Sequence, residues 1–207
     1  MAEEIIEQGY RELADTILEH NPGVDLGRVR AAFELADRAH SGQKRKAGTP
    51  YVTHCVAAAQ ICAEMGLDED SIVAALLHDC IEDTAITHED IARQFGAEVA
   101  DIVEGVTKLT RVQFTSREDE QMENLRKMLM AMAKDIRVIL IKIADRLHNM
   151  RTMEYMVAQK QLEKSLETME IYAPIAHRLG LQKVKWELED LSLKYLDPDG
   201  YREIITY

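Results

Sequence analysis

The 207-residue sequence has few of the residues that mark disulfide-linked, fibrous or membrane-embedded chains. Its three cysteines are too few and too irregularly spaced for a disulfide framework or a Cys-based zinc site, so we expect buried thiols in a reducing compartment. With four prolines and ten glycines, it is neither collagen-like nor of low complexity. No apolar run approaches the ~20 residues of a membrane-spanning helix, and the acidic start does not resemble a secretory signal. These absences favour a soluble, cytoplasmic protein that makes no membrane contact.

Positive charge is also scarce, because 25 Lys and Arg residues stand against 37 Asp and Glu residues, which gives a net charge of −12. Non-specific binding to nucleic acid or to a membrane surface needs a basic surface, so the composition argues against both. A local cluster of cations can still bind a small polyanion. The segment Lys44-Arg45-Lys46 is such a cluster.

Apolar residues recur at helical spacing almost throughout, and no segment alternates convincingly as a strand. We expect helices over residues 3–20, 25–40, 50–65, 160–177 and 181–196, and further ones that open near residues 68, 88, 117 and 135. The predicted N-caps are Asp25, Thr49, Asp68 and Asp135, with capping boxes at 87–90 and 116–119. The β-branched run 138–143 could form a strand, but polar residues recur around it at helical spacing. The sequence therefore predicts an all-α chain.

Ionisable residues interrupt several apolar helices, where burial is costly unless a partner is present. His78 and Asp79 follow the apolar run 74–77, and His54 lies early in another helix. Asp145 shares one helical face with Asn149 and Thr152.

Any one of these groups could be an ordinary hydrogen-bonded core residue. Together, however, His54, His78, Asp79 and Asp145 form a nitrogen and oxygen donor set of the kind that helical bundles use to bind a metal ion in the core. Without a thiolate, this set favours an octahedral divalent ion such as manganese over a closed zinc site. His148 is expected to support the site or the fold rather than to bind metal.

These four residues resemble the H…HD…D pattern of the HD-domain metal phosphohydrolases. More narrowly, the chain resembles the N-terminal hydrolase domain of the RelA/SpoT (Rel) family of alarmone enzymes. The matching stretches are HSGQKRKAGTPYVTH, LLHDCIEDT, VEGVTKL, ENLRKMLMAMAKDIRVILIKIADRLHNMRT and ETMEIYAPIAHRLG. They cover most of residues 36–196 in the same order. The resemblance implies an HD-domain helical bundle with a metal site in its core.

The resemblance also implies an activity, the hydrolysis of guanosine tetra- and pentaphosphate, (p)ppGpp, at the 3′ position in the stringent response. The products are GDP or GTP and pyrophosphate, which makes the implied enzyme a guanosine-3′,5′-bis(diphosphate) 3′-pyrophosphohydrolase. One Mn²⁺ per chain would be held by the residues that match His54, His78, Asp79 and Asp145.

The remaining site residues take their roles from the same resemblance. Glu82 and Asp83 match a pair that positions or activates the attacking water. Arg45 and Lys46 match a loop that lies over the guanine base in the family. Asn149 and Thr152 match residues that help to hold the nucleotide. Further candidates for a positive wall around the substrate are Lys108, Lys142, Arg146 and Arg151, of which about half should instead prove to be solvated or paired in salt bridges.

Three positions depart from the family pattern, but none is a proposed ligand. Ala47 stands where Ser is frequent, Cys55 where Pro is common, and Cys80 where the family has an aliphatic residue. The branch of the family that only synthesises alarmone loses the HD and ED pairs. Both pairs are present here, which predicts a hydrolytically competent site.

The resemblance continues past the hydrolase domain, so we expect residues 1–178 to form that domain. Residues 179–207 would then be a connecting helix and the start of a truncated synthetase domain. The synthetase and regulatory domains of a longer bifunctional enzyme would be missing. Two other functions remain open: an HD-domain phosphohydrolase of another nucleotide, and a non-catalytic nucleotide-binding regulatory module.

Overall fold

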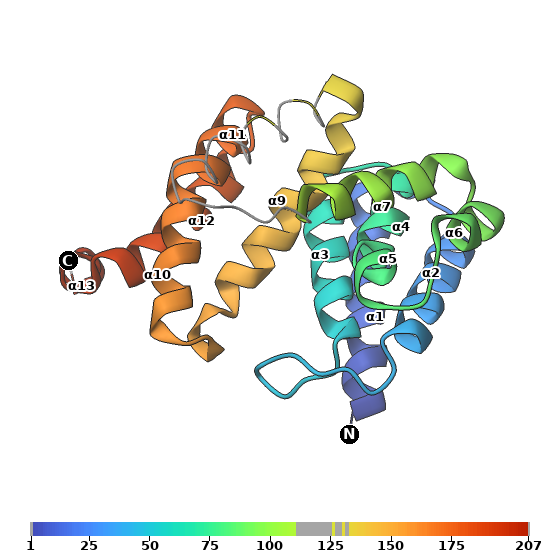
Figure 1. Cartoon of the computed structure of the whole chain (residues 1–207), viewed down its shortest axis with the longest axis horizontal. Helices are drawn as coiled ribbons and strands as arrows, with labels where there is room; N and C mark the ends of the chain where they lie inside the picture. Colours follow the sequence, from blue (N-terminus) through green and yellow to red (C-terminus); the bar gives the residue numbers. More distant parts are fainter. Residues whose placement is uncertain (1, 111–125, 127–129, 131–132, 207) are drawn as a thin grey trace.

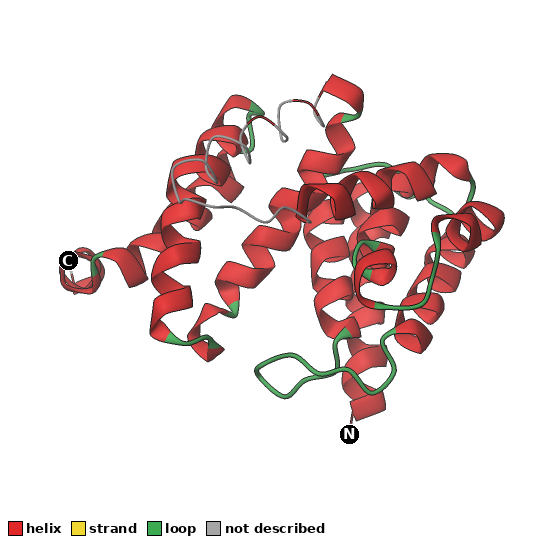
Figure 2. Ribbon diagram, in the orientation of Figure 1, coloured by secondary structure: helices red, strands yellow, loops and turns green. Residues whose placement is uncertain are grey.

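A computed structural model describes residues 2–110, 126, 130 and 133–206, and in this part of the chain it contains helices and no strand. Figure 2 shows this all-α architecture, which the sequence predicted. The α-helices are α1 (Ala2–His20), α2 (Leu26–Ala39), α3 (Val52–Glu64), α4 (Glu69–Leu77), α5 (Cys80–Asp83), α6 (His88–Phe95), α7 (Ala97–Thr110), α9 (Ile136–Arg151), α10 (Ala158–Glu167), α11 (Ala173–Arg178), α12 (Gln182–Leu196) and α13 (Pro198–Thr206). A 3₁₀ segment, η1 (Met153–Tyr155), follows α9, and a π-helical segment, η2 (Thr168–Tyr172), joins α10 to α11.

Helix α9 lies between two groups of helices (Figure 1). On one side it packs against α3, α4 and α7, and on the other it packs against α12 and η2. Its apolar residues, among them Ile141 and Leu147, are buried in the shared core. The polar face of α9 is therefore held at the junction of the two groups, where both can contribute side chains to one site.

Helix α4 is buried on every side, from Ser71 through Leu77. Burying a large aliphatic side chain such as Leu76 or Leu77 stabilises the fold by about 1.5–3 kcal/mol, so this helix is firmly seated at the centre of the core. The chain leaves α4 directly into His78 and Asp79. The apolar run therefore fixes these two polar residues inside the molecule.

Short-range hydrogen bonds begin the helices largely where the sequence predicted. Asp25, Asp68 and Asp135 each accept a hydrogen bond from a backbone N–H in the first turn of α2, α4 and α9. Thr87 and Asp90 form the expected reciprocal capping box on α6. The capping box predicted at 116–119 falls outside the described residues.

The loop before α3 differs from the prediction, because Thr49 is not an N-cap. The backbone of Arg45 donates to the Thr49 carbonyl at 2.9 Å, and Tyr51 donates to Gln43 at 3.0 Å. Lys44 and Pro50 form an isolated bridge. These contacts fold residues 41–51 back on themselves, and α3 begins at Val52.

The helix predicted to open near residue 68 is also interrupted. Helix α4 ends at Leu77, and α5 begins at Cys80. His78 and Asp79 keep right-handed helical backbone angles, and Asp83 N–H still donates to Asp79 C=O at 2.9 Å. The path is a bent helix that turns both side chains toward one side. At the far end of the chain, α13 begins at Pro198, where the predicted helix pattern ended.

Across the described ranges, none of the helices is long and apolar enough to cross a membrane. The three cysteines are reduced and buried, in agreement with the composition.

Candidate metal centre

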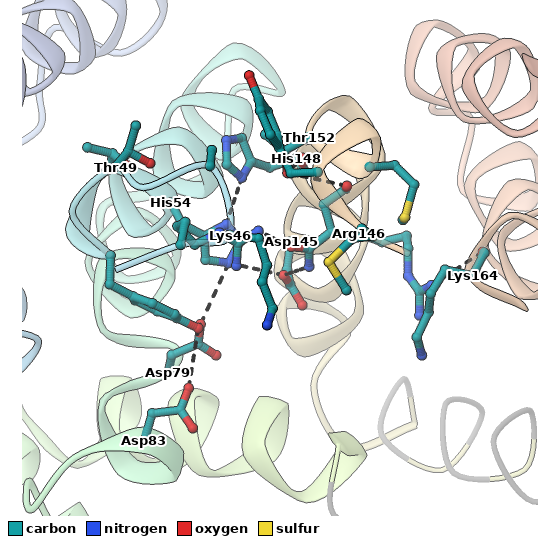
Figure 3. A pocket seen from close by; sticks show the side chains of 18 of the residues that line it. Lys46, Thr49, His54, Asp79, Asp83, Asp145, Arg146, His148, Thr152 and Lys164 are labelled. Carbon is teal, nitrogen blue, oxygen red and sulfur yellow. Dashed lines mark hydrogen bonds and ion pairs between the residues drawn. The ribbon is translucent and has the colours of Figure 1, made fainter. Parts of the chain in front are cut away.

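A cavity of about 860 Å³ opens at the junction of the two helix groups, beside the polar face of α9. Figure 3 shows its lining side chains. They come from the loop 41–51, α3, α5 and the turn before it, α7, α9, η1, α10 and η2. Segments far apart in the sequence therefore share one site.

The four candidate metal ligands meet beside one another, and three of them, His54, Asp79 and Asp145, line this cavity. Donor atoms of His54, His78 and Asp145 lie within 4.8 Å of one another. The Asp79 Oδ2 atom is 3.0 Å from His78 Nε2 and 3.6 Å from His54 Nε2, so it belongs to the same cluster. His54 Nε2 is 3.2 Å from Asp145 Oδ1. The structure thus brings together all four residues that the sequence singled out.

The donor set fits a divalent cation. His78 Nδ1 is 2.8 Å from the carbonyl of Ala75, which can only accept a hydrogen bond, so Nδ1 carries a hydrogen. In the neutral ring, Nε2 then carries a lone pair and no hydrogen. It is buried and has no well-oriented hydrogen-bond partner in the part of the chain that the structure describes, although Asp79 lies close to it. A lone pair facing carboxylates is unfavourable unless a positive charge lies between them.

The carboxylates near His78 also determine the pKa of its imidazole. Burial lowers this pKa, but the carboxylates of Asp79 and Asp145 outweigh burial and raise it to about 9. A divalent cation can take the place of the proton that these groups attract, because imidazole and carboxylate are both ligands for such ions. Their arrangement could therefore hold a metal ion.

Each ligand has a further contact that fixes its orientation. Asp145, which is 5% exposed, accepts from Lys142 Nζ at 2.7 Å and from Asn149 Nδ2 at 2.6 Å. Burial raises the pKa of Asp145, but Lys142 and the imidazoles outweigh it, so the pKa lies well below its ordinary value. His54 Nδ1 lies 2.7 Å from His148 Nδ1. Neighbouring groups of this kind are typical of metal sites, where they set ligand tautomer and direction.

The predicted catalytic pair lies beside the ligands. Glu82 and Asp83 both line the cavity. Tyr51 Oη donates to Asp79 Oδ2 at 2.8 Å and is 3.3 Å from Asp83 Oδ2, so one hydroxyl connects a ligand to the pair. Burial raises the pKa of Tyr51, and Asp79 raises it further, which keeps this phenol protonated. Tyr51 was not predicted from the sequence. Its one recognisable feature there is that it is an aromatic residue three positions before His54.

The four predicted nucleotide-binding residues also line the cavity: Arg45, Lys46, Asn149 and Thr152. The guanidinium of Arg45 donates to Asn149 Oδ1 at 2.6 Å, which connects the loop 41–51 to α9. The Nδ2 atom of the same Asn149 amide donates to Asp145 Oδ1. Two predicted substrate contacts are therefore connected to the metal end by hydrogen bonds.

The predicted positive wall is more strongly paired than the sequence reading expected. Each of its four members has a carboxylate partner: Lys108 with Glu104, Lys142 with Asp145, Arg146 with Glu167, and Arg151 with Glu187. Of these, Lys142 and Arg146 line the cavity. Helical spacing could have revealed the partners of Lys108 and Lys142, but not those of the two arginines.

The far end of the cavity contains residues that the sequence reading did not assign. Arg146 lies between Glu167, at 2.9 Å, and the face of the Tyr172 ring, at 4.2 Å from its centroid. Lys164 lies next to Glu167, and both line the cavity. Tyr172 belongs to η2, a π-helical segment of the kind that recurs at functional sites.

Comparison with known proteins agrees with this geometry. Residues 32–182 match the family model described as HD domain. The chain is 49% identical over 195 residues to the Escherichia coli K12 protein named bifunctional (p)ppGpp synthase/hydrolase SpoT, which covers 94% of this chain and 28% of that protein. It is 53% identical over 173 residues to a Synechocystis protein named probable guanosine-3′,5′-bis(diphosphate) 3′-pyrophosphohydrolase, covering 84% of this chain and 23% of that one.

A Mycobacterium leprae protein named probable GTP pyrophosphokinase is 52% identical, over 90% of this chain and 24% of its own length. The chain thus spans about a quarter of the length of these curated relatives. A solved structure, described as "A metazoan ortholog of SpoT hydrolyzes ppGpp and plays a role in starvation responses", superposes with a TM-score of 0.55 at 29% identity. The match covers 86% of this chain and 95% of that one.

The family model covers most of the chain, and the relatives align with nearly all of it. The matched region contains the histidine and aspartate cluster, and the aligned stretches lie in the all-α bundle described above. This chain belongs to the HD domain family and, within it, to the HD domains of the RelA/SpoT family.

Proposed function

We propose that this chain is a manganese-dependent (p)ppGpp 3′-pyrophosphohydrolase, which returns GDP or GTP and pyrophosphate. The observation that carries the proposal is a cluster of two imidazoles and two carboxylates beside a cavity that Arg45 and Lys46 also line. Relatives at about 50% identity that are named as hydrolases of this nucleotide support it. An enzyme acting on a polyphosphate needs both a divalent cation and positively charged side chains.

A divalent cation bound by His54, His78, Asp79 and Asp145 would lower the pKa of a water molecule and neutralise charge on phosphoryl oxygens. The mixed nitrogen and oxygen donors suit Mn²⁺ better than they suit a Zn²⁺ ion in a closed site. One ion per chain is expected, because the donors form one cluster.

Asp83 and Glu82 would orient the attacking water and take its proton. A carboxylate within one hydrogen bond of the reacting water is a suitable general base. In the reaction, a water oxygen bonds to phosphorus, and the bond between that phosphorus and the 3′ oxygen breaks. Pyrophosphate leaves, and the 3′ oxygen recovers a proton. Tyr51 holds Asp79 by a hydrogen bond and keeps Asp83 next to it.

Arg45 would stack its planar guanidinium on the guanine base, and Lys46 would offer charge to the phosphates. Asn149 and Thr152 would hold the nucleoside. Because Arg45 now donates to Asn149, binding would exchange that hydrogen bond for contacts with the nucleotide.

The wider context is proposed on the same grounds. Residues 1–178 would be the hydrolase domain and residues 179–207 the link into a synthetase domain. The small share of each relative that the chain spans supports a place within a longer protein. The longer protein would act in the cytoplasm, with (p)ppGpp as its small-molecule partner and no nucleic acid bound by this part.

The test is a product assay with purified protein, Mn²⁺, (p)ppGpp and a panel of ordinary and deoxynucleotides. Release of pyrophosphate from (p)ppGpp, with little turnover of the panel, supports the proposal. Equal rates on ordinary triphosphates would indicate an HD phosphohydrolase of another nucleotide. Tight binding of (p)ppGpp without turnover would indicate a regulatory module.

A further inference from the structure

His148 contacts the candidate ligand His54, and the proposed reaction gives His148 no role. Its Nδ1 atom lies 2.7 Å from Nδ1 of His54, with the ring centroids 4.8 Å apart. His54 is 1% exposed and His148 is partly buried, so the contact is partly shielded from water. Two imidazole nitrogens at this distance share one hydrogen, which means that one ring donates and the other accepts.

The opposite nitrogen of His54 decides which ring donates. His54 Nε2 faces Asp145 Oδ1 at 3.2 Å and Asp79 Oδ2 at 3.6 Å, on the side where the candidate ligands gather. A neutral imidazole binds a cation through a nitrogen that carries no hydrogen, so the hydrogen of His54 must be on Nδ1. His148 Nδ1 must then accept.

The other three ligands have partners whose hydrogen-bonding role is fixed. The Ala75 carbonyl can only accept from His78, and the Lys142 ammonium can only donate to Asp145. Tyr51 donates to Asp79. His148 differs because an imidazole nitrogen can donate or accept, so the tautomers of His148 and His54 depend on each other.

We propose that His148 is a positioning residue: it accepts the Nδ1 hydrogen of His54 and thereby presents the Nε2 lone pair of His54 to the divalent cation. This inference rests on the metal site of the proposed function. Helix α9 supplies both Asp145 and His148, so one rigid element provides a ligand and the group that orients a second ligand.

Three substitutions separate this role from simple packing. The Asn side chain places its Oδ1 close to the position of His Nδ1, whereas Gln reaches the position of Nε2. Leu fills similar space without an acceptor. We expect His148→Leu and His148→Gln to weaken Mn²⁺ binding roughly 10- to 100-fold, and His148→Asn to remain close to wild type. Isothermal titration of the metal-free proteins with Mn²⁺ measures this, and no substrate is required.

His177→Leu is the matched control, because His177 is an exposed histidine that contacts Gln182 and does not line the cavity. It should bind Mn²⁺ like wild type. Circular dichroism melts of the metal-free proteins check folding, and if His148→Leu does not fold, the Asn and Gln pair decides. Equal weakening by Asn and Gln, or unchanged affinity in a folded His148→Leu, would overturn the inference.

The metal titration also separates this inference from the proposed function. If the variants follow the expected order but wild type does not hydrolyse (p)ppGpp, the positioning role holds and the function fails. If wild type hydrolyses (p)ppGpp and His148→Leu keeps full Mn²⁺ affinity, the function holds and the positioning role fails.

Discussion

Two regions of the cavity are built in different ways. One is the metal end, and the other is the part lined by Arg45 and Lys46, which we propose binds the nucleotide and which is called the nucleotide end below. At the metal end, His54 and His78 are each 1% exposed, and every candidate ligand has a partner inside the protein. At the nucleotide end, Arg45 and Lys46 extend from a loop that the Asn149 amide connects to α9. The metal end is fixed by the apolar core around it, whereas the nucleotide end is held by polar contacts that a ligand can replace.

This difference separates binding of the cation from binding of the nucleotide. A site positioned by buried helices keeps its geometry without ligand, because moving it would disrupt the core. A side chain held by one exchangeable hydrogen bond can move at low cost. Substitutions at the metal end should therefore affect metal affinity and turnover together, and those at the nucleotide end should mainly affect nucleotide affinity.

The largest effect is expected for Asp145→Asn. The change removes a charged ligand and leaves the ammonium of Lys142 without its carboxylate. We expect Mn²⁺ affinity to fall by more than about 100-fold, which exceeds the loss typical for an outer contact, and hydrolysis to disappear with it. Titration calorimetry and the product assay measure the two losses.

Asp101→Asn is the control for this change. Asp101 is exposed and pairs with His88, away from the cavity. The control should bind and hydrolyse normally. Full Mn²⁺ binding by folded Asp145→Asn would remove Asp145 from the ligand set.

The second prediction tests whether Glu82 and Asp83, which lie beside the four candidate ligands, act in the reaction without binding the metal. In Glu82→Gln and Asp83→Asn, kcat should fall by roughly 10²- to 10⁴-fold, because a general base is lost. Mn²⁺ should still bind with one ion per chain, since neither side chain is among the four ligands. Steady-state kinetics measures kcat, and titration measures Mn²⁺ binding. If the variants lost Mn²⁺ binding together with turnover, these residues would be metal ligands instead.

A smaller effect is expected at the nucleotide end. Arg45→Ala should raise KM for (p)ppGpp about 10-fold, the scale of one cation stacked on a ring, and leave Mn²⁺ affinity nearly unchanged. Lys108→Ala is the control, because Lys108 pairs with Glu104 and does not line the cavity. If Arg45→Ala lowered kcat and left KM unchanged, the loop would belong to the chemical step.

The smallest effect concerns stability at the far wall. Burial raises the pKa of Glu167, but Arg146 and Lys164 outweigh it, so the pKa is lowered. A lowered pKa contributes stability above the unfolded value of about 4.3, and this contribution is lost as the pH falls through the folded value. At pH 7, Glu167→Gln should cost about 1 kcal/mol of unfolding free energy.

Urea unfolding across pH measures this contribution. The difference between wild type and Glu167→Gln should be largest near neutral pH and shrink below about pH 4. Glu163→Gln is the control on the same helix: its side chain is 41% exposed, so its pair with Lys160 is screened by water and its loss should leave stability nearly unchanged. A difference that persisted at acid pH would assign the effect to packing rather than charge.

The metal end could be predicted from sequence because its signal is local. His78 and Asp79 stand out after the buried run of α4, and Asp145 stands out among the apolar residues of α9. Caps such as Asp25 and Asp135 are equally local, and they were correct. The cost of burying a charge makes such residues conspicuous in any apolar helix.

The remaining features depend on contacts between distant segments. Thr49 looked like a cap, but pairing across the loop 41–51 fixes its backbone instead. Tyr51 and Glu167 give no periodic signal, and the partner of Arg146 is 21 positions away in the sequence. No glycine or proline marks the interruption between α4 and α5 at His78 and Asp79, so the sequence pattern did not predict it.

Crystals grown with Mn²⁺ and measured at the manganese absorption edge test the central claim most directly. The account predicts one anomalous peak per chain, at coordination distance from Nε2 of both His54 and His78 and from a carboxylate oxygen of both Asp79 and Asp145. A peak elsewhere, or none in this cluster at saturating Mn²⁺, would contradict it.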